Sequence, residues 1–570
     1  MEGLEQMKNK VVDPKDELER ILATKVKKLG YSEDVNLAYD RTLAHGDLVT
    51  PVALNLAARA KKKPMQVAEE LIDGLSLHSS IDSVNIARPG FINFTLAQEY
   101  LGNIATNSIT LPLKDAKHSK IRVVVEYSSP NIAKPFSVGH LRSTIIGDAV
   151  ANLYAALGYN VTRVNHLGDW GTQFGKLIYA YKTWGDDKKL EADPIGEMLA
   201  LYVKFHTEAE IDTTIENHAR RWFKKLADGD DEAKDLWRKF VRWSMVEFRR
   251  VYNLLGVKFD KEMGESFYGP LLADVIASIK KQGLARVSDG ALVIKFPRAE
   301  MPLALLQKND GTSLYMTRDL AALKYRLQKM KADTVIYHTG DEQTLHFKQL
   351  FKIAELMGWD KGKTLVHAAH GLMRLPEGKM STRRGRVIKL DDLLSEAVRR
   401  AYSVVNKKNP KLSQKQKQAI AQTVGIAAVK YNDLANHRRT AVVFNWNKML
   451  SLEGNSAPYL LYAYARLHSI QSKTQVVPKL GAMNEDEQKL IRRSAQFADV
   501  IEEAANTQAP NILAHYLFEL ANAYSSYYEK YPVLKADSTT RQHRLAIIRA
   551  GADTLKSGLA LLGISVLDKI

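Results

Sequence analysis

The sequence predicts an α/β fold with a central parallel-sheet domain, an N-terminal α+β domain and a C-terminal all-α helical bundle. Three observations support this prediction. A chain of 570 residues is too long for a single hydrophobic core. Strand and helix patterns alternate between residues 113 and 400, which is typical of a parallel sheet. From residue 401 to 570 only helical patterns occur, so we expect three domains spanning 1–112, 113–400 and 401–570.

The first domain combines helical runs with a hairpin pattern. Helices are expected over residues 16–30, 48–63 and 65–75, followed by alternating strands at 83–96 that break at Pro89 and Gly90. Phe91 and Asn93 follow that turn. They suit either an exposed stacking ring with an amide reader or an ordinary hairpin, and this segment alone favours the hairpin.

The central domain opens on EYSSPNIAKPFSVGHLRST, residues 126–144. This stretch follows the branched apolar run IRVVVEY, which suits a strand buried on both faces, and it precedes an amphipathic helical run at 141–159. Such a loop lies at the carboxyl edge of a parallel sheet, and the helix N-terminus offers free N–H groups to a phosphate. Gly139 allows close approach of a ligand beside the His140 imidazole. The stretch therefore predicts a nucleotide site.

The rest of the central domain continues the alternation. A charged helical stretch at about 185–256 is expected to be an insertion between strands. The helical run at 313–330 places Tyr315 and Asp319 on one face. Further strands are expected at 333–340 and 363–374. The loop PEGKMSTRRGR, residues 376–386, combines glycines, hydroxyls and cations, which suits a phosphate clamp or simply a basic turn.

The C-terminal bundle is rich in tyrosine. Helices are expected over 413–431, 456–471, 512–531 and 541–563. Most of the tyrosines should lie in the core with their hydroxyls at its rim, but aromatic and arginine side chains also stack on unpaired bases.

The composition favours a soluble cytoplasmic protein with a polyanionic partner. The net charge of +18 points to nucleic acid, although a basic surface can also serve solubility alone. The charged N-terminus does not suit a signal peptide, and no run suits a membrane span, so we expect no membrane partner. Without cysteine there are no thiolate metal sites, and we expect no zinc.

Two short motifs occur in a specific order. The loop from Ser137 to His140 resembles the first signature of class I aminoacyl-tRNA synthetases, and Lys379-Met380-Ser381 resembles the second. The segments SSPNIAKPFSVGHLRSTIIGD, NHLGDWGTQFGKL, LYMTRDLAA, GKMSTRRGR and GLALLGI resemble arginyl-tRNA synthetase of bacterial type, over nearly the whole chain.

This resemblance implies an N-terminal domain that recognises the tRNA elbow, a Rossmann-type catalytic domain and a helical anticodon-binding domain. It implies ATP-dependent attachment of L-arginine to tRNA through an arginyl-adenylate, with ATP accompanied by Mg²⁺. It also implies a monomer without an editing domain, whose activation step requires tRNA.

The resemblance also implies roles for individual residues. In the activation step negative charge grows on phosphoryl oxygens, so catalysis is mostly positioning and cationic stabilisation. The expected catalytic residues are His140, Lys379, Lys134 and Ser137. The arginine substrate is expected to contact Glu126, Asn131, Tyr315, Asp319 and Gln343. ATP is expected to contact Ser128, Pro135, Gly139, His140, Met373, Lys379, Met380 and Ser381. The expected tRNA contacts are Phe91, Asn93, Tyr459, Arg466 and Tyr527.

The chain departs from the family pattern at three positions. Ser137 stands where the first signature opens with His, and its hydroxyl can donate a hydrogen bond but carries no charge. Thr382 stands where the second signature has a further Lys; Lys134, Arg383 and Arg384 are the alternatives for that charge. The chain ends in Ile570 where many relatives end in Met.

Other functions are less well supported by the sequence. A cysteine-specific class I synthetase would be expected to hold zinc through Cys, and glutamine or glutamate enzymes remain rivals. A nucleotidyltransferase without tRNA does not account for the Tyr-rich bundle. Only Ser137 favours a non-catalytic RNA-binding protein. No G-x-G-x-x-G follows a strand, which argues against a Rossmann oxidoreductase.

Overall fold

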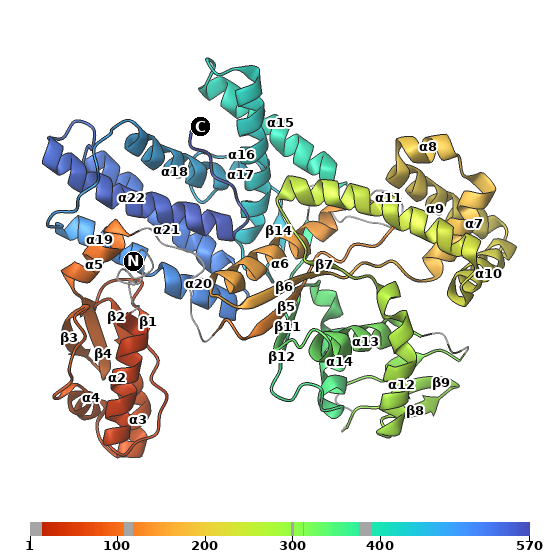
Figure 1. Ribbon diagram of the computed structural model, residues 1–570, viewed down its shortest axis with the longest axis horizontal. Coiled ribbons are helices and arrows are strands. Elements are labelled where there is room, and N and C mark those ends of the chain that lie inside the picture. The colour runs from red at the N-terminus through yellow and green to blue at the C-terminus, as the bar shows by residue number, and fades with distance from the viewer. Residues whose placement is uncertain are drawn as a thin grey trace, which may run out of the picture.

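A five-stranded parallel sheet lies at the centre of the protein (Figure 1). The computed structural model describes residues 14–107, 118–297, 301–309, 311, 313–374 and 389–569. The strand order is β12-β11-β5-β6-β7, with every neighbouring pair parallel. The strands are β5 (Arg122–Glu126), β6 (Asn160–Asn165), β7 (Lys261–Glu262), β11 (Thr334–Tyr337) and β12 (Thr364–His367). The predicted Rossmann-type sheet is confirmed.

The valines of β5 explain why this strand is central. Val123 and Val125 belong to the core that includes α6 (Val138–Ala156) and the C-terminal bundle. Val124 belongs to a second core with α13 (Tyr315–Gln328) and α14 (Thr344–Leu356). Alternate side chains of a strand point to opposite faces, so both faces of the sheet are covered.

Helix α6 is buried on nearly every side. It lies between the sheet and bundle helices, contacting α16 (Gln414–Leu434), α20 (Phe497–Asn506) and α22 (Ser538–Leu561). The prediction that this run is amphipathic was wrong. The sequence pattern contains polar residues such as Arg142 and Asp148, but tertiary contacts bury both of them.

A helical insertion separates β6 from β7 and extends to one side of the sheet (Figure 1). Its first helix begins at Thr172, ahead of the start at about residue 185 that the sequence predicts. Its helices are α7 (Thr172–Trp184), α8 (Asp187–Ala192), α9 (Pro194–Ile211), α10 (Thr214–Asp228) and α11 (Asp231–Leu255). The chain then forms η1 (Glu265–Leu271), α12 (Leu272–Lys281) and an antiparallel sheet of β8 (Ala285–Ser288), β9 (Ala291–Ile294) and β10 (Ala304–Gln307).

The N-terminal domain is α+β, as predicted. Its antiparallel sheet has the order β1-β2-β4-β3. The elements are α2 (Pro14–Lys28), β1 (Ala38–Tyr39), β2 (Leu48–Thr50), α3 (Val52–Ala60), α4 (Pro64–Ile72), β3 (Ile81–Ala87), β4 (Phe91–Leu96) and α5 (Gln98–Thr106). The helix expected over 48–63 is therefore shorter. Residues 48–50 pair with β4, and Pro51 caps the helix that follows.

The C-terminal region is a helical bundle, as predicted, apart from the two-residue strand β14 (Val442–Val443), which pairs with β13 (Met373–Arg374). The other bundle helices are α15 (Leu390–Lys408), α17 (Trp446–Met449), α18 (Ala457–Ser472), α19 (Glu485–Ala495) and α21 (Asn511–Lys530). The short helix η3 (Asp341–Gln343) lies in the central domain, between β11 and α14. The boundary expected at 400/401 falls inside α15, and the domain division stays a prediction.

The N-terminal domain packs against the bundle through α5, which contacts α19 and α22. Arg492 of α19 forms an ion pair with the buried carboxylate of Asp47. Across the ranges that the structure describes, none of the helices combines the length and apolarity needed to cross a membrane.

Candidate functional site

The loops after β5 and β11 meet where the winding of the sheet reverses direction. From β5 the chain adds β6 and then β7 toward one edge of the sheet, and it later adds β11 and β12 on the opposite side of β5. The N–H of His338 donates to the carbonyl of Glu126 at 2.8 Å, and the Ser143 hydroxyl donates to the carbonyl of His338 at 2.5 Å. Both loops and α6 are therefore joined at the carboxyl edge, the usual ligand position in such sheets.

The loop after β5 is held in an unusual backbone shape. Ser128, Ser129 and Ala133 have φ angles of 72°, 48° and 62°. Two residues of α11 brace this loop: the Tyr252 hydroxyl lies 2.8 Å from that of Ser128, and Ser244 Oγ accepts from the Ala133 N–H at 2.9 Å. Left-handed backbone is costly for these residue types, so the insertion helix helps to fix the loop.

His140 lies in the first turn of α6. Its Nδ1 accepts a hydrogen bond from the Ser137 backbone N–H at 3.1 Å, and Ser137 Oγ lies 3.1 Å from the same nitrogen. Burial lowers the pKa of His140 to about 4, and Lys134 acts in the same direction. The ring is therefore neutral at pH 7 with its proton on Nε2. It can donate a hydrogen bond to a phosphate but supplies no charge.

The other residues expected to contact ATP on this loop differ in exposure. Ser128 and Pro135 are buried, whereas Lys134 and Gly139 are exposed. Lys134 Nζ lies 5.7 Å from the centre of the Tyr202 ring, which belongs to α9 of the insertion. Lys134 is therefore the loop cation that faces solvent beside the helix N-terminus.

A cluster of carboxylate and imidazole side chains lies near the start of α13. Asp319 Oδ2 is 2.6 Å from His346 Nε2, and Asp319 Oδ1 is 3.9 Å from His166 Nε2. His166 Nδ1 in turn accepts from Arg326 at 3.3 Å. Asp319 thus lies between two imidazoles, one from β6's end and one from α14.

Glu265 adds a second acidic group to this cluster. Burial raises its pKa to about 8; the Asp319 carboxylate adds to the rise, while Arg318 opposes it. Arg318 Nε lies 3.9 Å from the Glu265 carboxylate, too far for a hydrogen bond. A cation that entered beside Asp319 and Glu265 would therefore stabilise the ionised form of Glu265, which Arg318 offsets only in part.

Tyr315 and Gln343 are both exposed. Tyr315 begins α13 and is 65% exposed. Burial of its hydroxyl raises the pKa of Tyr315, with Glu265 and Asp319 contributing and Arg318 opposing. Gln343 precedes α14, is exposed, and stands one turn before His346. The structure thus brings Tyr315 and Asp319 together. Gln343 is near them only in that it precedes His346, which contacts Asp319.

Glu126 and Asn131 have partners within the protein. The Glu126 carboxylate forms a buried ion pair with Arg326, whose guanidinium stacks on the Tyr337 ring at 5.2 Å. Asn131 is exposed and forms a parallel backbone bridge with Gly168. Their expected contact with the α-amino and carboxylate end of arginine stays a prediction, and Glu126 would have to serve Arg326 at the same time.

The second signature lies outside the described residues, with Lys379, Met380, Ser381, Thr382, Arg383 and Arg384. The described residues on either side of it lie near α6. Met373 is buried on β13, which contacts α6, and Lys389 forms a backbone bridge with Ser137. Chain flanking the second signature is therefore attached beside the first.

The bundle presents aromatic and basic side chains at its surface. The Arg466 guanidinium lies 4.8 Å from the Tyr462 ring and 5.5 Å from the Tyr528 ring. The Tyr459 hydroxyl donates to Asn522 Oδ1 at 2.6 Å. These side chains lie on α18 and α21. Such stacked rings and cations suit unpaired bases.

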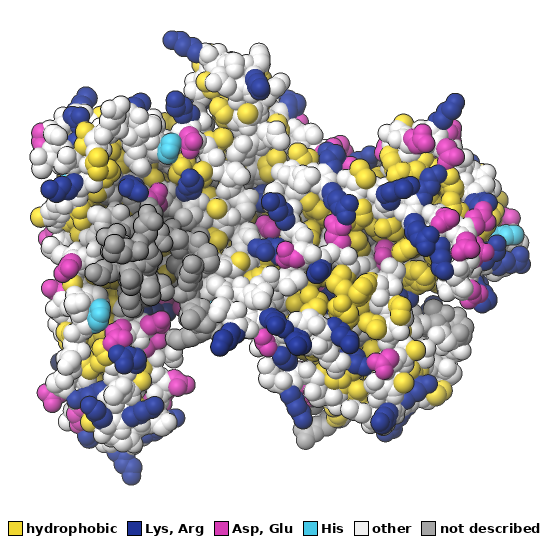
Figure 2. All heavy atoms as spheres, in the orientation of Figure 1, with side chains coloured by type: hydrophobic (Ala, Val, Ile, Leu, Met, Phe, Trp, Pro, Cys, Tyr) yellow, Lys and Arg dark blue, Asp and Glu magenta, His cyan; other side chains and the backbone are white. Residues whose placement is uncertain are grey.

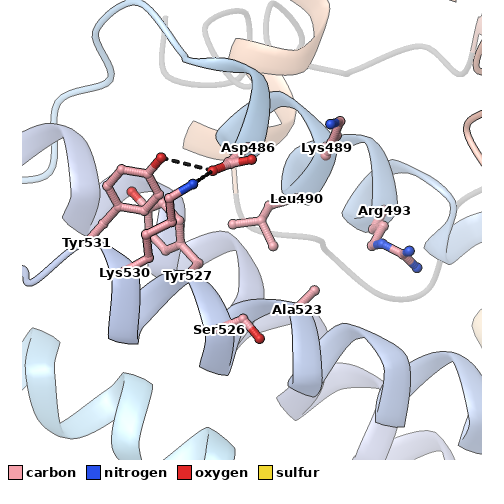
Figure 3. A pocket seen from close by; sticks show the side chains of 9 residues that line it. All are labelled: Asp486, Lys489, Leu490, Arg493, Ala523, Ser526, Tyr527, Lys530 and Tyr531. Atoms are coloured by element: carbon pink, nitrogen blue, oxygen red, sulfur yellow. Dashed lines mark hydrogen bonds and ion pairs between the residues drawn. The ribbon is translucent and has the colours of Figure 1, made fainter.

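A groove runs between α19 and α21. One part, with a volume of about 320 Å³, is lined by Lys489, Arg493, Tyr527 and Lys530 among others; Figure 3 shows Lys530 and Tyr531 pointing at Asp486. The adjoining part, about 830 Å³, also includes Arg41 from the N-terminal domain. Tyr527 is only 4% exposed and donates to Glu487, so little of the Tyr527 ring is accessible from the groove.

The expected elbow contacts differ in accessibility. Phe91 is half-buried at the start of β4, and Asn93 is buried between β2 and β3, opposite Val49 and Asn85. On the face in Figure 2, Lys and Arg side chains are spread over every part of the molecule. The net charge therefore does not single out one patch on that face.

Comparison with known proteins agrees with this geometry. The family model described as tRNA synthetases class I (R), catalytic domain, matches residues 103–446. The DALR anticodon binding domain matches 460–570, and the arginyl tRNA synthetase N terminal domain matches 16–96. The catalytic match defines the class of the protein as a class I tRNA synthetase.

Individual relatives identify the family. The chain is 41% identical to the arginine–tRNA ligase of Fusobacterium nucleatum, over 89% of this chain and 90% of that protein, and 40% identical to that of Halothermothrix orenii, over 92% and 94%. The solved Thermus thermophilus arginyl-tRNA synthetase matches with a TM-score of 0.86 and 26% identity, over 98% of this chain and 100% of that one. The chain belongs to the arginyl-tRNA synthetase family, and the resemblance predicted from the sequence is confirmed.

Several groups in the site were not singled out from the sequence. His166 lies in the quoted motif NHLGDWG, but nothing in the motif indicated that its ring would lie between Asp319 and Arg326. Glu265, Arg326 and His346 come from segments with ordinary charge patterns. Only the fold brings them to the cluster, so sequence spacing offered no signal for them.

Proposed function

We propose that this chain joins L-arginine to tRNA in two steps at the carboxyl edge of its parallel sheet. One observation supports this most directly. The acidic groups of Asp319 and Glu265 lie beside the chain that follows β6, at the same sheet edge as the N-terminus of α6, which bears His140. A cationic side chain and a phosphate can therefore be held side by side.

In the first step a carboxylate oxygen of arginine attacks the α-phosphorus of ATP. The bond from that phosphorus to the β-phosphate oxygen breaks, and pyrophosphate leaves with the electron pair. His140 Nε2–H, the N–H groups that begin α6 and Lys134 donate to the phosphoryl oxygens as charge develops there. Because His140 is neutral, the positive charge must come from Lys134 and from the second signature.

In the second step a ribose hydroxyl at the 3′ end of tRNA attacks the carbonyl carbon of the adenylate. The ester bond to the ribose forms, the bond to AMP breaks, and the hydroxyl proton passes to the phosphate of the departing AMP. We infer that this step depends mainly on positioning, since AMP is already a good leaving group.

The guanidinium of arginine fits the acidic cluster. It carries five N–H donors in a plane and asks for matched acceptors. We assign Asp319 and Glu265 as its charged partners, and the Tyr315 hydroxyl and Gln343 amide as neutral ones. A neutral citrulline would bring no positive charge to Asp319 and Glu265, which supports its rejection.

The bundle surface is assigned to tRNA. The Tyr462–Arg466–Tyr528 stack and Tyr459 offer rings for unpaired bases, whereas the groove between α19 and α21 offers cations for the backbone. Phe91 is assigned to the tRNA elbow. Asn93 and Tyr527 would have to become exposed before they could contact tRNA.

Magnesium is assigned to the ATP phosphates. In the ranges that the structure describes, there is no group of three or more metal-ligating side chains. Mg²⁺ commonly binds through phosphates and water with few protein ligands, so the phosphates suffice as its main ligands. We further propose that the enzyme works as a monomer in the cytoplasm.

Pyrophosphate exchange with each amino acid, with and without total tRNA, tests the proposal. We expect exchange with arginine when tRNA is present, and charging of tRNA with arginine alone. Exchange with glutamine or glutamate, or none with arginine in the presence of tRNA, would contradict it. Size-exclusion chromatography with light scattering at micromolar concentration tests the monomer.

A further inference from the structure

Arg142 lies two residues after His140 on α6, and its contacts are with Asp433, Gly371 and Thr440. Its side chain is 1% exposed, so its charge lies fully inside the protein. Burying a guanidinium is costly unless every donor finds an acceptor. The acceptors of Arg142 come from three separate segments of the chain.

The first acceptor belongs to the helical bundle. Arg142 Nε donates to both oxygens of Asp433 at 3.0 Å, and Nη2 lies 2.9 Å from Oδ1. Asp433 is fully buried near the end of α16. This planar contact fixes the orientation of the guanidinium.

The other two acceptors are main-chain carbonyls. Arg142 Nη1 donates to the carbonyl of Gly371 at 2.8 Å and to that of Thr440 at 2.8 Å. Gly371 and Thr440 each precede one strand of the β13–β14 pair by two residues, and Met373 is the residue of β13 that faces Val442. The guanidinium therefore holds the base of that small sheet.

The chain at Gly371 is confined on its other side as well. Its N–H donates to the carbonyl of Arg438 at 2.9 Å, and a Cβ placed on it would lie 2.5 Å from the carbonyl oxygen of Arg439. Gly371 therefore contacts both Arg142 and the 438–440 segment, and a shift of either one would displace Gly371 and, through it, the other.

We propose that Arg142 is a positioning residue that sets the distance between the two sides of the ATP site, His140 on α6 and Met373 on β13. It acts through Asp433, which aims the guanidinium, and through Gly371 and Thr440, which it holds. This inference rests on the proposed assignment of His140 and Met373 to ATP. The acidic cluster near the start of α13 shares none of these contacts, so the effect should be specific for ATP.

The test compares Arg142→Lys with Arg492→Lys. Both replace an arginine that pairs with a buried carboxylate and joins two parts of the protein. Arg492, however, lies on α19 of the bundle, pairs with Asp47 of the N-terminal domain, and is far from these strands in sequence. A lysine keeps the charge but cannot reach acceptors in three directions with a planar fork. In arginylation assays on the full chain, we expect Arg142→Lys to raise KM for ATP about tenfold and to lower kcat, with KM for arginine within about twofold of wild type. Arg492→Lys should leave both KM values within about twofold.

Asp433→Asn is the second variant, with Asp47→Asn as its match, in case Arg142→Lys fails to fold. The amide keeps the size of the side chain but weakens its hold on Arg142, so we expect a smaller rise in KM for ATP and none with Asp47→Asn. Circular dichroism and the fraction of active sites titrated by adenylate formation correct for unfolded protein.

Two kinds of result would overturn the inference. If the Arg142 and Arg492 variants change both KM values alike, or if KM for arginine rises as much as that for ATP, Arg142 serves stability only. Unchanged KM for ATP in folded Arg142→Lys and Asp433→Asn also rejects it. A wild-type chain that fails to charge tRNA with arginine would instead reject the proposed function, and the two failures are thus distinguishable.

Discussion

Charged side chains are largely shielded from solvent in the site at the sheet edge and largely exposed on the surface of the helical bundle. In the site Glu126 pairs with a buried Arg326, and Asp319 lies between two histidines. On the bundle, Arg466 stacks on Tyr462, which is 41% exposed. Burial strengthens an electrostatic contact and solvent screens it, so one substitution in the site should matter more than one on the bundle.

Asp319→Ala should have the largest effect. It removes a carboxylate that we assign to the guanidinium, and loss of one partner of a buried charge pair costs about 2–5 kcal/mol. We expect kcat/KM for arginine to fall accordingly, while KM for ATP changes little. Arginylation kinetics with each substrate varied in turn measure both.

The matched control for Asp319 is Asp274→Ala, which removes an exposed carboxylate that pairs with Lys324 beside the same helix. It should leave the kinetics unchanged. A near-normal KM for arginine in Asp319→Ala would mean that another carboxylate holds the guanidinium.

His140→Ala should follow. Removing one preorganised donor to a developing oxyanion lowers kcat about 10²- to 10³-fold. Because burial holds the pKa of His140 near 4, the wild-type enzyme should show no change from this group between pH 6 and 9. Steady-state kcat over that range, for wild type and variant, tests both statements.

His218→Ala is the control for His140, since His218 stacks on Tyr179 within the insertion. A fall in wild-type kcat on raising the pH through 6 to 7, absent from His140→Ala, would show that the imidazolium is the active form.

Glu265 should make arginine binding depend on pH. In the free protein the pKa of about 8 keeps the group largely protonated at pH 7, and a guanidinium binds its ionised form. KM for arginine should therefore fall between pH 6 and 8.5, and Glu265→Gln should raise KM at high pH and flatten the profile. Glu262→Gln, on the exposed strand β7, should keep the wild-type profile.

The same group should affect stability with a definite sign. The folded chain holds the Glu265 proton up to about pH 8, whereas the unfolded chain releases it near 4.5. Its contribution to the free energy of unfolding therefore declines as pH rises from 4.5 to 8. Glu265→Gln should lose less stability than wild type across that window in thermal unfolding; an equal loss would show that Glu265 ionises normally.

Arg466→Ala should have the smallest effect and a different character. We expect KM for tRNA to rise a few-fold and the salt dependence of tRNA binding to weaken by about one unit of slope. Arginine and ATP kinetics should not change. An unchanged affinity for tRNA at low and high salt would exclude this stack from the interface, and Arg220→Ala in the insertion is the control.

The sequence anticipated the parts of the site that lie within one local segment. Val123 to Val125 predicted a strand buried on both faces, and the loop before His140 predicted a helix N-terminus. Tyr315 and Asp319 share a helix, as their spacing predicted. Such features depend on backbone periodicity and on turn chemistry, which neighbouring residues set.

Other features could not be predicted in this way. The amphipathic pattern assigned to α6 was wrong because the sheet covers one side and the bundle the other. Residues 48–50 form a strand instead of the predicted helix, because they pair with β4, which lies more than 40 residues away. The pKa of Glu265 depends on its burial and on Asp319, Arg318 and Asp169, which come from two segments far from Glu265 in sequence.

By itself, then, the sequence determined most of the order of strands and helices, the family, and the residue types that we propose to face arginine and ATP. The tertiary structure alone decided which charges are buried and with which partner. Burial in the folded protein makes His140 a neutral donor. Folding also pairs Glu126 with Arg326 and brings Arg142 into contact with Asp433 of the bundle and with Gly371, which precedes β13. Burial and long-range pairing are properties of surfaces brought together by folding, and no spacing along the chain encodes them.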